Sequence, residues 1–238
     1  MSNLQQVESK LIQSLGLTRR PVSVSILDDI PEGVDKFDGV VPSGCTFWRL
    51  AADGATFYTV AGDHYNCPVG AYTHNIPLPE SRAAELPQVL SVMMGVGYLK
   101  EDEIPGIGRL AGTPKVIVYA PLGDAPVAPD VVIVAGAARS LMLLVEAATR
   151  AGVPAKTALL ARPTCMAIPM AMKLGTVAST GCIGNRIYTE LRDDESYVAI
   201  PGPSVALIAA ELDTIISANH ELEKYHLARR EQLTAISR

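Results

Sequence analysis

Four cysteines are the residues of this chain best suited to chemistry. Cys45, Cys67, Cys165 and Cys182 each lie in a short segment that favours a turn. Their contexts are Pro-Ser-Gly-Cys45-Thr, Asn-Cys67-Pro-Val-Gly, Arg-Pro-Thr-Cys165 and Gly-Cys182-Ile-Gly. Free cysteine usually behaves as a small buried hydrophobe, whereas Gly, Pro, Thr and Asn allow a backbone to wrap a metal or expose a thiolate. Four thiolates are also the full ligand set of a structural zinc or of an iron–sulfur cluster.

The spacing of the cysteines leaves three uses open: a shared metal or cluster site, one or two reactive thiols, and inert buried side chains. The chain has no C-x2-C pair, so shared ligation requires four separate loops to converge. The Cys67-Pro68 step is similar to the Cys-Pro step that follows ferredoxin ligands.

Few other residues add to this chemistry. His64 and His74 flank Cys67 and could act as ligands or as a base beside its thiolate, although a polar loop with surface histidines is the favoured interpretation. Arg186 could lower the pKa of the nearby Cys182 or hold an anionic substrate. The chain has no G-x-G-x-x-G after a strand, no Walker sequence, no H-E-x-x-H and no G-x-S-x-G.

Composition indicates a folded α/β protein. The chain has 238 residues, 48% of them hydrophobic and 19% charged, and aliphatic side chains dominate its apolar part. The formal charge of −5 argues against nucleic acid as a partner. We expect no membrane association, because the start does not resemble a signal peptide and no run of roughly 18 apolar residues exists. These features favour a cytoplasmic protein, in which disulfides are a less favoured use of the cysteines.

Hydrophobic periodicity predicts helices and strands that must position the cysteines. We expect a single domain over 1–238 with a mixed or parallel sheet, flanking helices and a long C-terminal helix. The predicted helices span residues 3–15, 81–96 (with Pro87 in its first turn or kinking it), 137–151 and 204–236, the last broken near Asn219. The predicted strands span residues 22–26, 115–122 and 130–135, and the last two are expected to be buried on both faces.

A weak similarity between the two halves of the sequence suggests an internal duplication. Cys45 and Cys67 are 22 residues apart, and Cys165 and Cys182 are 17 apart, with similar Gly-rich neighbours. A pseudo-repeat with halves of about 21–122 and 130–202 would bring both cysteine pairs to one end of the core.

Several ordered segments resemble the DUF169 family of bacterial and archaeal proteins. They are Pro21-Val-Ser-Val, Asn66-Cys-Pro-Val-Gly-Ala-Tyr72, Pro129-Asp-Val-Val-Ile-Val-Ala-Gly136, Gly181-Cys-Ile-Gly-Asn-Arg186 and Ala199-Ile-Pro-Gly202. The resemblance implies that all four cysteines occupy the family's cysteine positions. It supplies no activity.

These observations together favour an iron–sulfur cluster, most simply [4Fe-4S], held by Cys45, Cys67, Cys165 and Cys182. Such a cluster could pass electrons to a redox partner, as in an oxidoreductase, or bind a small-molecule substrate, with His64 and Arg186 tuning its potential. The C-terminal helix is expected to make a homodimer. The alternatives are a metal-free enzyme with Cys67 or Cys182 as nucleophile and a binding protein stabilised by zinc.

Overall fold

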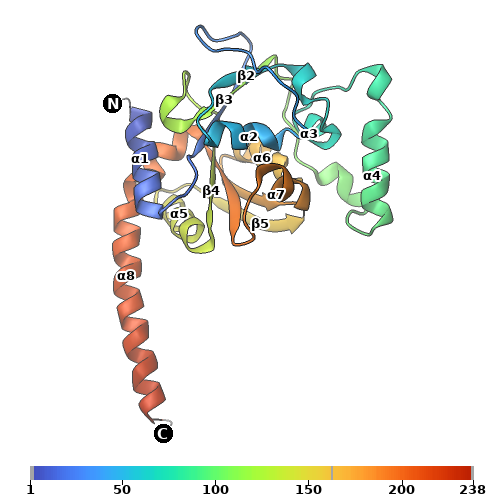
Figure 1. Cartoon of the computed structure of the whole chain (residues 1–238). Coiled ribbons are helices and arrows are strands. Elements are labelled where there is room, and N and C mark those ends of the chain that lie inside the picture. Colours follow the sequence, from blue (N-terminus) through green and yellow to red (C-terminus); the bar gives the residue numbers. More distant parts are fainter. Residues whose placement is uncertain (1–2, 162, 237–238) are drawn as a thin grey trace.

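A seven-stranded sheet forms the centre of the computed structural model, which describes residues 3–161 and 163–236 (Figure 1). The strand order is β2-β3-β1-β4-β7-β6-β5. The strands are β1 (Val22–Leu27), β2 (Phe57–Thr59), β3 (Val116–Pro121), β4 (Val131–Ala137), β5 (Ala155–Ala161), β6 (Val177–Gly181) and β7 (Glu195–Pro201).

Helices complete the α/β architecture that the sequence predicts. The α-helices are α1 (Asn3–Leu15), α2 (Cys45–Ala52), α3 (Pro68–Thr73), α4 (Glu85–Gly95), α5 (Ala138–Arg150), α6 (Ala167–Leu174), α7 (Ile183–Thr189) and α8 (Val205–Ile236). Short 3₁₀ helices are η1 (Ala61–His64), η2 (Glu80–Arg82), η3 (Glu101–Gly106), η4 (Leu122–Asp124), η5 (Thr164–Met166) and η6 (Gly202–Ser204).

The sheet is predominantly antiparallel. Every described pair of neighbouring strands is antiparallel except β5 and β6 at one edge. Of the two alternatives expected, a mixed or a parallel sheet, the parallel one is wrong, and the sheet is mixed only through that edge pair. The unbroken apolar runs of β3 and β4 arise because both faces of the sheet are covered, which does not require parallel neighbours.

Two hydrophobic cores lie on opposite faces of the sheet, and the alternation along β4 shows how they divide. Val131 and Ile133 face the core that contains Phe47, Trp48 and the apolar side of α6. Val132 and Val134 face the second core, under α1, α5 and the first half of α8. The period of two along a strand thus makes a three-layer molecule.

Most predicted elements are present, with small shifts at their ends. Pro87 lies in the first turn of α4, and Gly152 follows α5 with a positive φ of 76°. The break expected near Asn219 is absent, since α8 runs through this residue. The Asn219 amide donates to the Ile215 carbonyl and to Glu146 Oε2. None of the described helices combines the length and apolarity that a bilayer crossing needs.

The elements around the two cysteine pairs follow one another in the same order. Cys45 begins α2 and Cys67 precedes α3, with β2 between them. Cys165 precedes α6 and Cys182 precedes α7, with β6 between them. The strand order is also similar, since β3 lies between β2 and β1 as β7 lies between β6 and β4, and β5 is an additional strand at the edge. Duplication of 21–122 and 130–202 stays a prediction.

Candidate functional site

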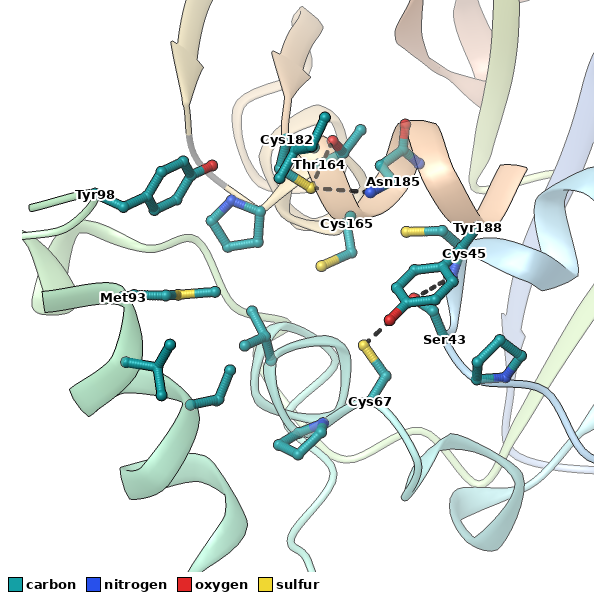
Figure 2. A pocket seen from close by; sticks show the side chains of 18 of the residues that line it. Ser43, Cys45, Cys67, Met93, Tyr98, Thr164, Cys165, Cys182, Asn185 and Tyr188 are labelled. Carbon is teal, nitrogen blue, oxygen red and sulfur yellow. Dashed lines mark hydrogen bonds between the residues drawn. The ribbon is translucent and has the colours of Figure 1, made fainter. Parts of the chain in front are cut away.

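All four cysteines line one pocket, although they come from four separate segments of the chain. Cys45 is the first residue of α2, Cys67 is the N-cap of α3, Cys165 lies in η5 and Cys182 is the N-cap of α7. Figure 2 shows their sulfur atoms around a common space. The cavity volume is about 410 Å³. The sequence thus identified residues that the fold brings together.

Cys67 is held by the start of α3. Its Sγ accepts hydrogen bonds from the Gly70 backbone N–H at 3.3 Å and from the Ser43 hydroxyl at 3.5 Å. Pro68 fits the first helical position, where no N–H is needed. A Cβ on residue 70 would lie 2.9 Å from the Cys67 sulfur, so glycine is what allows this sulfur to fold back over the helix.

Cys182 is held in the same way at the start of α7. Its Sγ accepts from the Asn185 backbone N–H at 3.4 Å and from the Thr164 hydroxyl at 3.4 Å. Each of these two cysteines therefore receives one backbone N–H from three residues ahead and one hydroxyl from the segment that carries another cysteine. Both sulfurs are therefore held in place as hydrogen-bond acceptors at the start of a helix.

Cys45 and Cys165 lie deeper, and both are buried. Burial raises the pKa of the Cys45 thiol to about 12, against the opposing effect of the Asn185 side chain. Burial also raises the pKa of Cys165 well above its ordinary value, and charge on the other three cysteines raises it further. These two groups are therefore neutral thiols in the metal-free protein. Four thiolates here would repel one another unless a cationic group replaced the protons.

The sulfur atoms line a cavity and do not converge on one point. Within residues 3–161 and 163–236, no three His, Cys, Asp or Glu side chains are grouped so that they could hold a metal ion. A structural zinc needs all its thiolates about 2.3 Å from a single centre. A four-iron cluster places each thiolate on a different iron and so occupies more space.

The two histidines are buried, so the interpretation of this segment as a loop with surface histidines is wrong. The His64 Nε2 lies 2.9 Å from the Thr59 hydroxyl, and burial, with a smaller effect from His74, lowers the pKa of His64 to about 3. The His74 Nδ1 lies 2.9 Å from the Gly70 carbonyl oxygen. Neither belongs to the described lining of the pocket. Both are neutral groups in the core behind α3.

Arg186 does not line the pocket either. Its guanidinium donates to the Arg192 carbonyl at 2.8 Å and lies outside the described lining, so its expected roles toward Cys182 and a substrate stay predictions. Arg162, in the segment before Cys165, lies outside the described residues.

Sequence reasoning missed three polar residues and one helix of this site. Ser43 and Thr164 stand one or two positions before a cysteine, and a hydroxyl so placed is a signal that could have been weighed. Asn185 carries no such signal. The apolar stripe of α4, which forms the far wall, depends on a long-range arrangement that local patterns do not reveal.

Comparisons with known proteins identify the family. Neither the curated proteins nor the solved structures include a significant match to this chain. The family model of DUF169, described as uncharacterised ArCR, matches residues 10–210 of the 238. That range contains all four cysteines and every strand of the sheet. The chain therefore belongs to the DUF169 family.

Proposed function

We propose that Cys45, Cys67, Cys165 and Cys182 hold an iron–sulfur cluster of the four-iron type, in a redox or substrate-binding role. One observation carries the proposal: the chain has four cysteines, and all four line the same pocket. Cysteines kept only for packing have no reason to meet at one cavity from segments more than 130 residues apart.

The residues present fit such a group. Four thiols match the ligand number of a four-iron cluster, and two of the sulfurs already receive hydrogen bonds from backbone N–H groups and hydroxyls. Hydrogen bonds to sulfur are among the features that set the potential of a cluster. When bound, the cluster would supply one-electron transfer or an iron that accepts an electron pair. A cytoplasmic location, as expected from the sequence, would keep the thiols reduced.

Single Cys→Ser substitutions test the ligand set. Each of the four variants should retain less iron and sulfide than the parent protein after anaerobic reconstitution. Ser43→Ala is the matched control, because it removes a hydrogen bond to Cys67 and leaves all four thiols. It should keep full iron and change the reduction potential. Four Cys→Ser variants with undiminished iron would overturn the proposal.

A second candidate is a metal-free enzyme with Cys67 or Cys182 as its nucleophile. The observation in its favour is the pair of N–H and O–H donors on each of these sulfurs, which suits a reactive thiolate. It predicts that the metal-free protein is active and that one substitution abolishes this activity, whereas the cluster proposal requires all four cysteines.

We propose further that α8 joins two copies of the chain. Every described residue from 221 to 233 is exposed, including Leu222, Tyr225, Leu227 and Leu233. Figure 1 shows this half of the helix projecting away from the sheet. A bare helix of this length is marginal in water, so packing against a second helix would stabilise it.

A further inference from the structure

The pocket has two chemically different ends. Cysteine thiols, with Ser43 and Asn185, line one end, and α4 with the segment that follows it lines the other. Figure 2 shows Met93 and Tyr98 across the cavity from the cysteine sulfurs. A cluster would occupy the sulfur end. Its ligands do not need α4, so the apolar end requires a separate explanation.

The wall formed by α4 is an apolar helical stripe. Val89, Val92, Met93 and Val96 follow the spacing i, i+3, i+4, i+7 and all line the pocket. An apolar stripe of this kind normally packs into a core. Here α4 has no buried residue, Val92 and Val96 are 65% and 75% exposed, and the helix stands at the edge of the molecule (Figure 1). The stripe lacks a covering surface on its pocket side.

The described lining of the pocket contains no charged side chain. Lys, Arg, His, Asp and Glu are all absent from it, and the remainder is mainly Val, Met, Pro, Ile and Tyr. A phosphate or carboxylate that entered would lose its hydration without gaining a partner of opposite charge. The described part of the lining therefore favours a neutral ligand.

One polar group is available to orient such a ligand. The Asn185 side chain is 3% exposed, and its Nδ2 makes no hydrogen bond of ordinary geometry to a described residue, although it lies close enough to the Cys45 thiol to act on it. A buried amide donor whose nearest partner is a weakly accepting thiol would gain free energy from an incoming carbonyl oxygen. Because Asn185 lies near both Cys45 and Cys182 in Figure 2, an acceptor bound to it would lie beside their sulfur atoms.

We infer that this pocket binds a small neutral molecule with an apolar chain along α4 and one hydrogen-bond acceptor, such as a carbonyl oxygen, at Asn185. The cavity volume of about 410 Å³ lies at the lower end of the range for small-molecule sites. That the cysteines are the reacting end rests on the proposed function. The binding itself does not require a cluster.

The test uses metal-free, full-length protein and measures protection of Cys67 and Cys182 from iodoacetamide. A neutral ketone, 2-octanone, should slow their alkylation, and octanoate of equal chain length should not. The half-protecting concentration should fall roughly tenfold from 2-hexanone to 2-octanone, because two more methylenes are buried. Equal protection by octanoate, or none by 2-octanone, would overturn the inference.

Two adjacent methionines provide a matched pair of variants. Met93 lines the pocket, whereas Met94 is absent from its described lining and is 37% exposed. Met93→Gln should weaken protection by 2-octanone about fivefold or more, and Met94→Gln should leave it unchanged. Neither side chain is buried, so both variants should fold. Equal effects of the two would contradict the assignment of α4 as the binding wall.

Failure of this inference is distinguishable from failure of the cluster proposal. Protection by 2-octanone in a protein that never retains iron would leave the apolar site standing and remove the cluster. A protein that holds the cluster, but whose metal-free form is not protected, would remove the apolar site alone.

Discussion

At the scale of single residues, the Cys67 sulfur can take its position because residue 70 is a glycine and has no side chain. The sulfur lies only 2.9 Å from the position that a Cβ on residue 70 would take, and it accepts a hydrogen bond from the Gly70 N–H. The Gly in Cys-Pro-Val-Gly is therefore explained by close packing against a ligand candidate.

Substituting this glycine should displace the sulfur. We expect Gly70→Ala to lower the free energy of unfolding of the metal-free protein by about 1–3 kcal/mol, through overpacking, and to reduce reconstituted iron. Urea unfolding and iron analysis measure the two effects. Gly184→Ala is the control, since its Cβ would have an ordinary contact of 3.7 Å with Tyr188. It should be neutral or stabilising by about 0.4–1 kcal/mol. Equal losses in both variants would refute the close-packing argument.

The four thiols should differ in reactivity when no metal is bound. Burial raises the pKa of Cys45 to about 12 and that of Cys165 well above its ordinary value, so both stay protonated and shielded at pH 8. Cys67 and Cys182 are partly exposed. Iodoacetamide labelling followed by peptide mass analysis should modify Cys67 and Cys182 first, and all four only in urea. Labelling of Cys45 as fast as Cys67 would show that the buried pair is not formed.

At the scale of elements, α8 has two halves with different surroundings. The first half packs on α1 and α5, and the second half is exposed. Ion pairs connect α8 to α5, and the one furthest along α8 joins Arg139 Nη2 to Glu223 Oε2 at 3.2 Å.

Removing the second half should change assembly more than folding. A chain that ends at Lys224 should keep the melting temperature of the parent metal-free protein within a few degrees, because every residue from 225 to 233, the part of the deleted segment whose side chains are described, is exposed. If α8 joins two copies, light scattering should show a dimer for the full chain and a monomer for the shortened one. A full-length monomer, or a shortened dimer, would contradict the proposed pairing.

The elements were predictable where their signals are local. The helical spacing of residues 3–15 and the β-branched runs near β3 and β4 correspond to α1 and to two central strands. Strand direction was not predictable, because full burial on both faces occurs here in antiparallel strands that helices cover. The sequence also could not show that α4 has no buried residue, since its apolar stripe is typical of a helix packed into a core.

At the scale of the whole molecule, two buried histidines should make the metal-free protein sensitive to acid. Burial lowers the pKa of His64 to about 3 and lowers that of His74 as well. Below the ordinary histidine pKa of 6.5, these two side chains take up protons in the unfolded chain but stay neutral in the folded chain. The free energy of unfolding therefore falls as pH falls.

The expected loss for His64 is about 2 kcal/mol between pH 7 and pH 5. Urea unfolding at both pH values measures it. His64→Gln should remove about that much of the pH dependence, whereas His226→Gln, at an exposed position of α8, should not. An unchanged pH dependence in His64→Gln would show that His64 is not buried as a neutral group.

The candidate site was predictable in its reactive atoms and not in its shape. Turn-forming neighbours single out the four cysteines, and the fold brings them to one pocket. Contacts between distant segments bring the other parts of the site to the cysteines, and such contacts could not be predicted from the sequence. These parts are the hydroxyls of Ser43 and Thr164, the Asn185 amide and the wall formed by α4. The histidines were misjudged because nearness in sequence does not fix the direction of a side chain.

Iron and sulfide content, with a visible absorption spectrum, tests the central claim most directly. The protein is purified without oxygen, reconstituted, and compared with the Cys67→Ser variant. We predict about four iron and four sulfide per chain and a broad band near roughly 400 nm that dithionite bleaches, all diminished in the variant. A colourless protein that binds fewer than about two iron per chain after reconstitution would contradict the account.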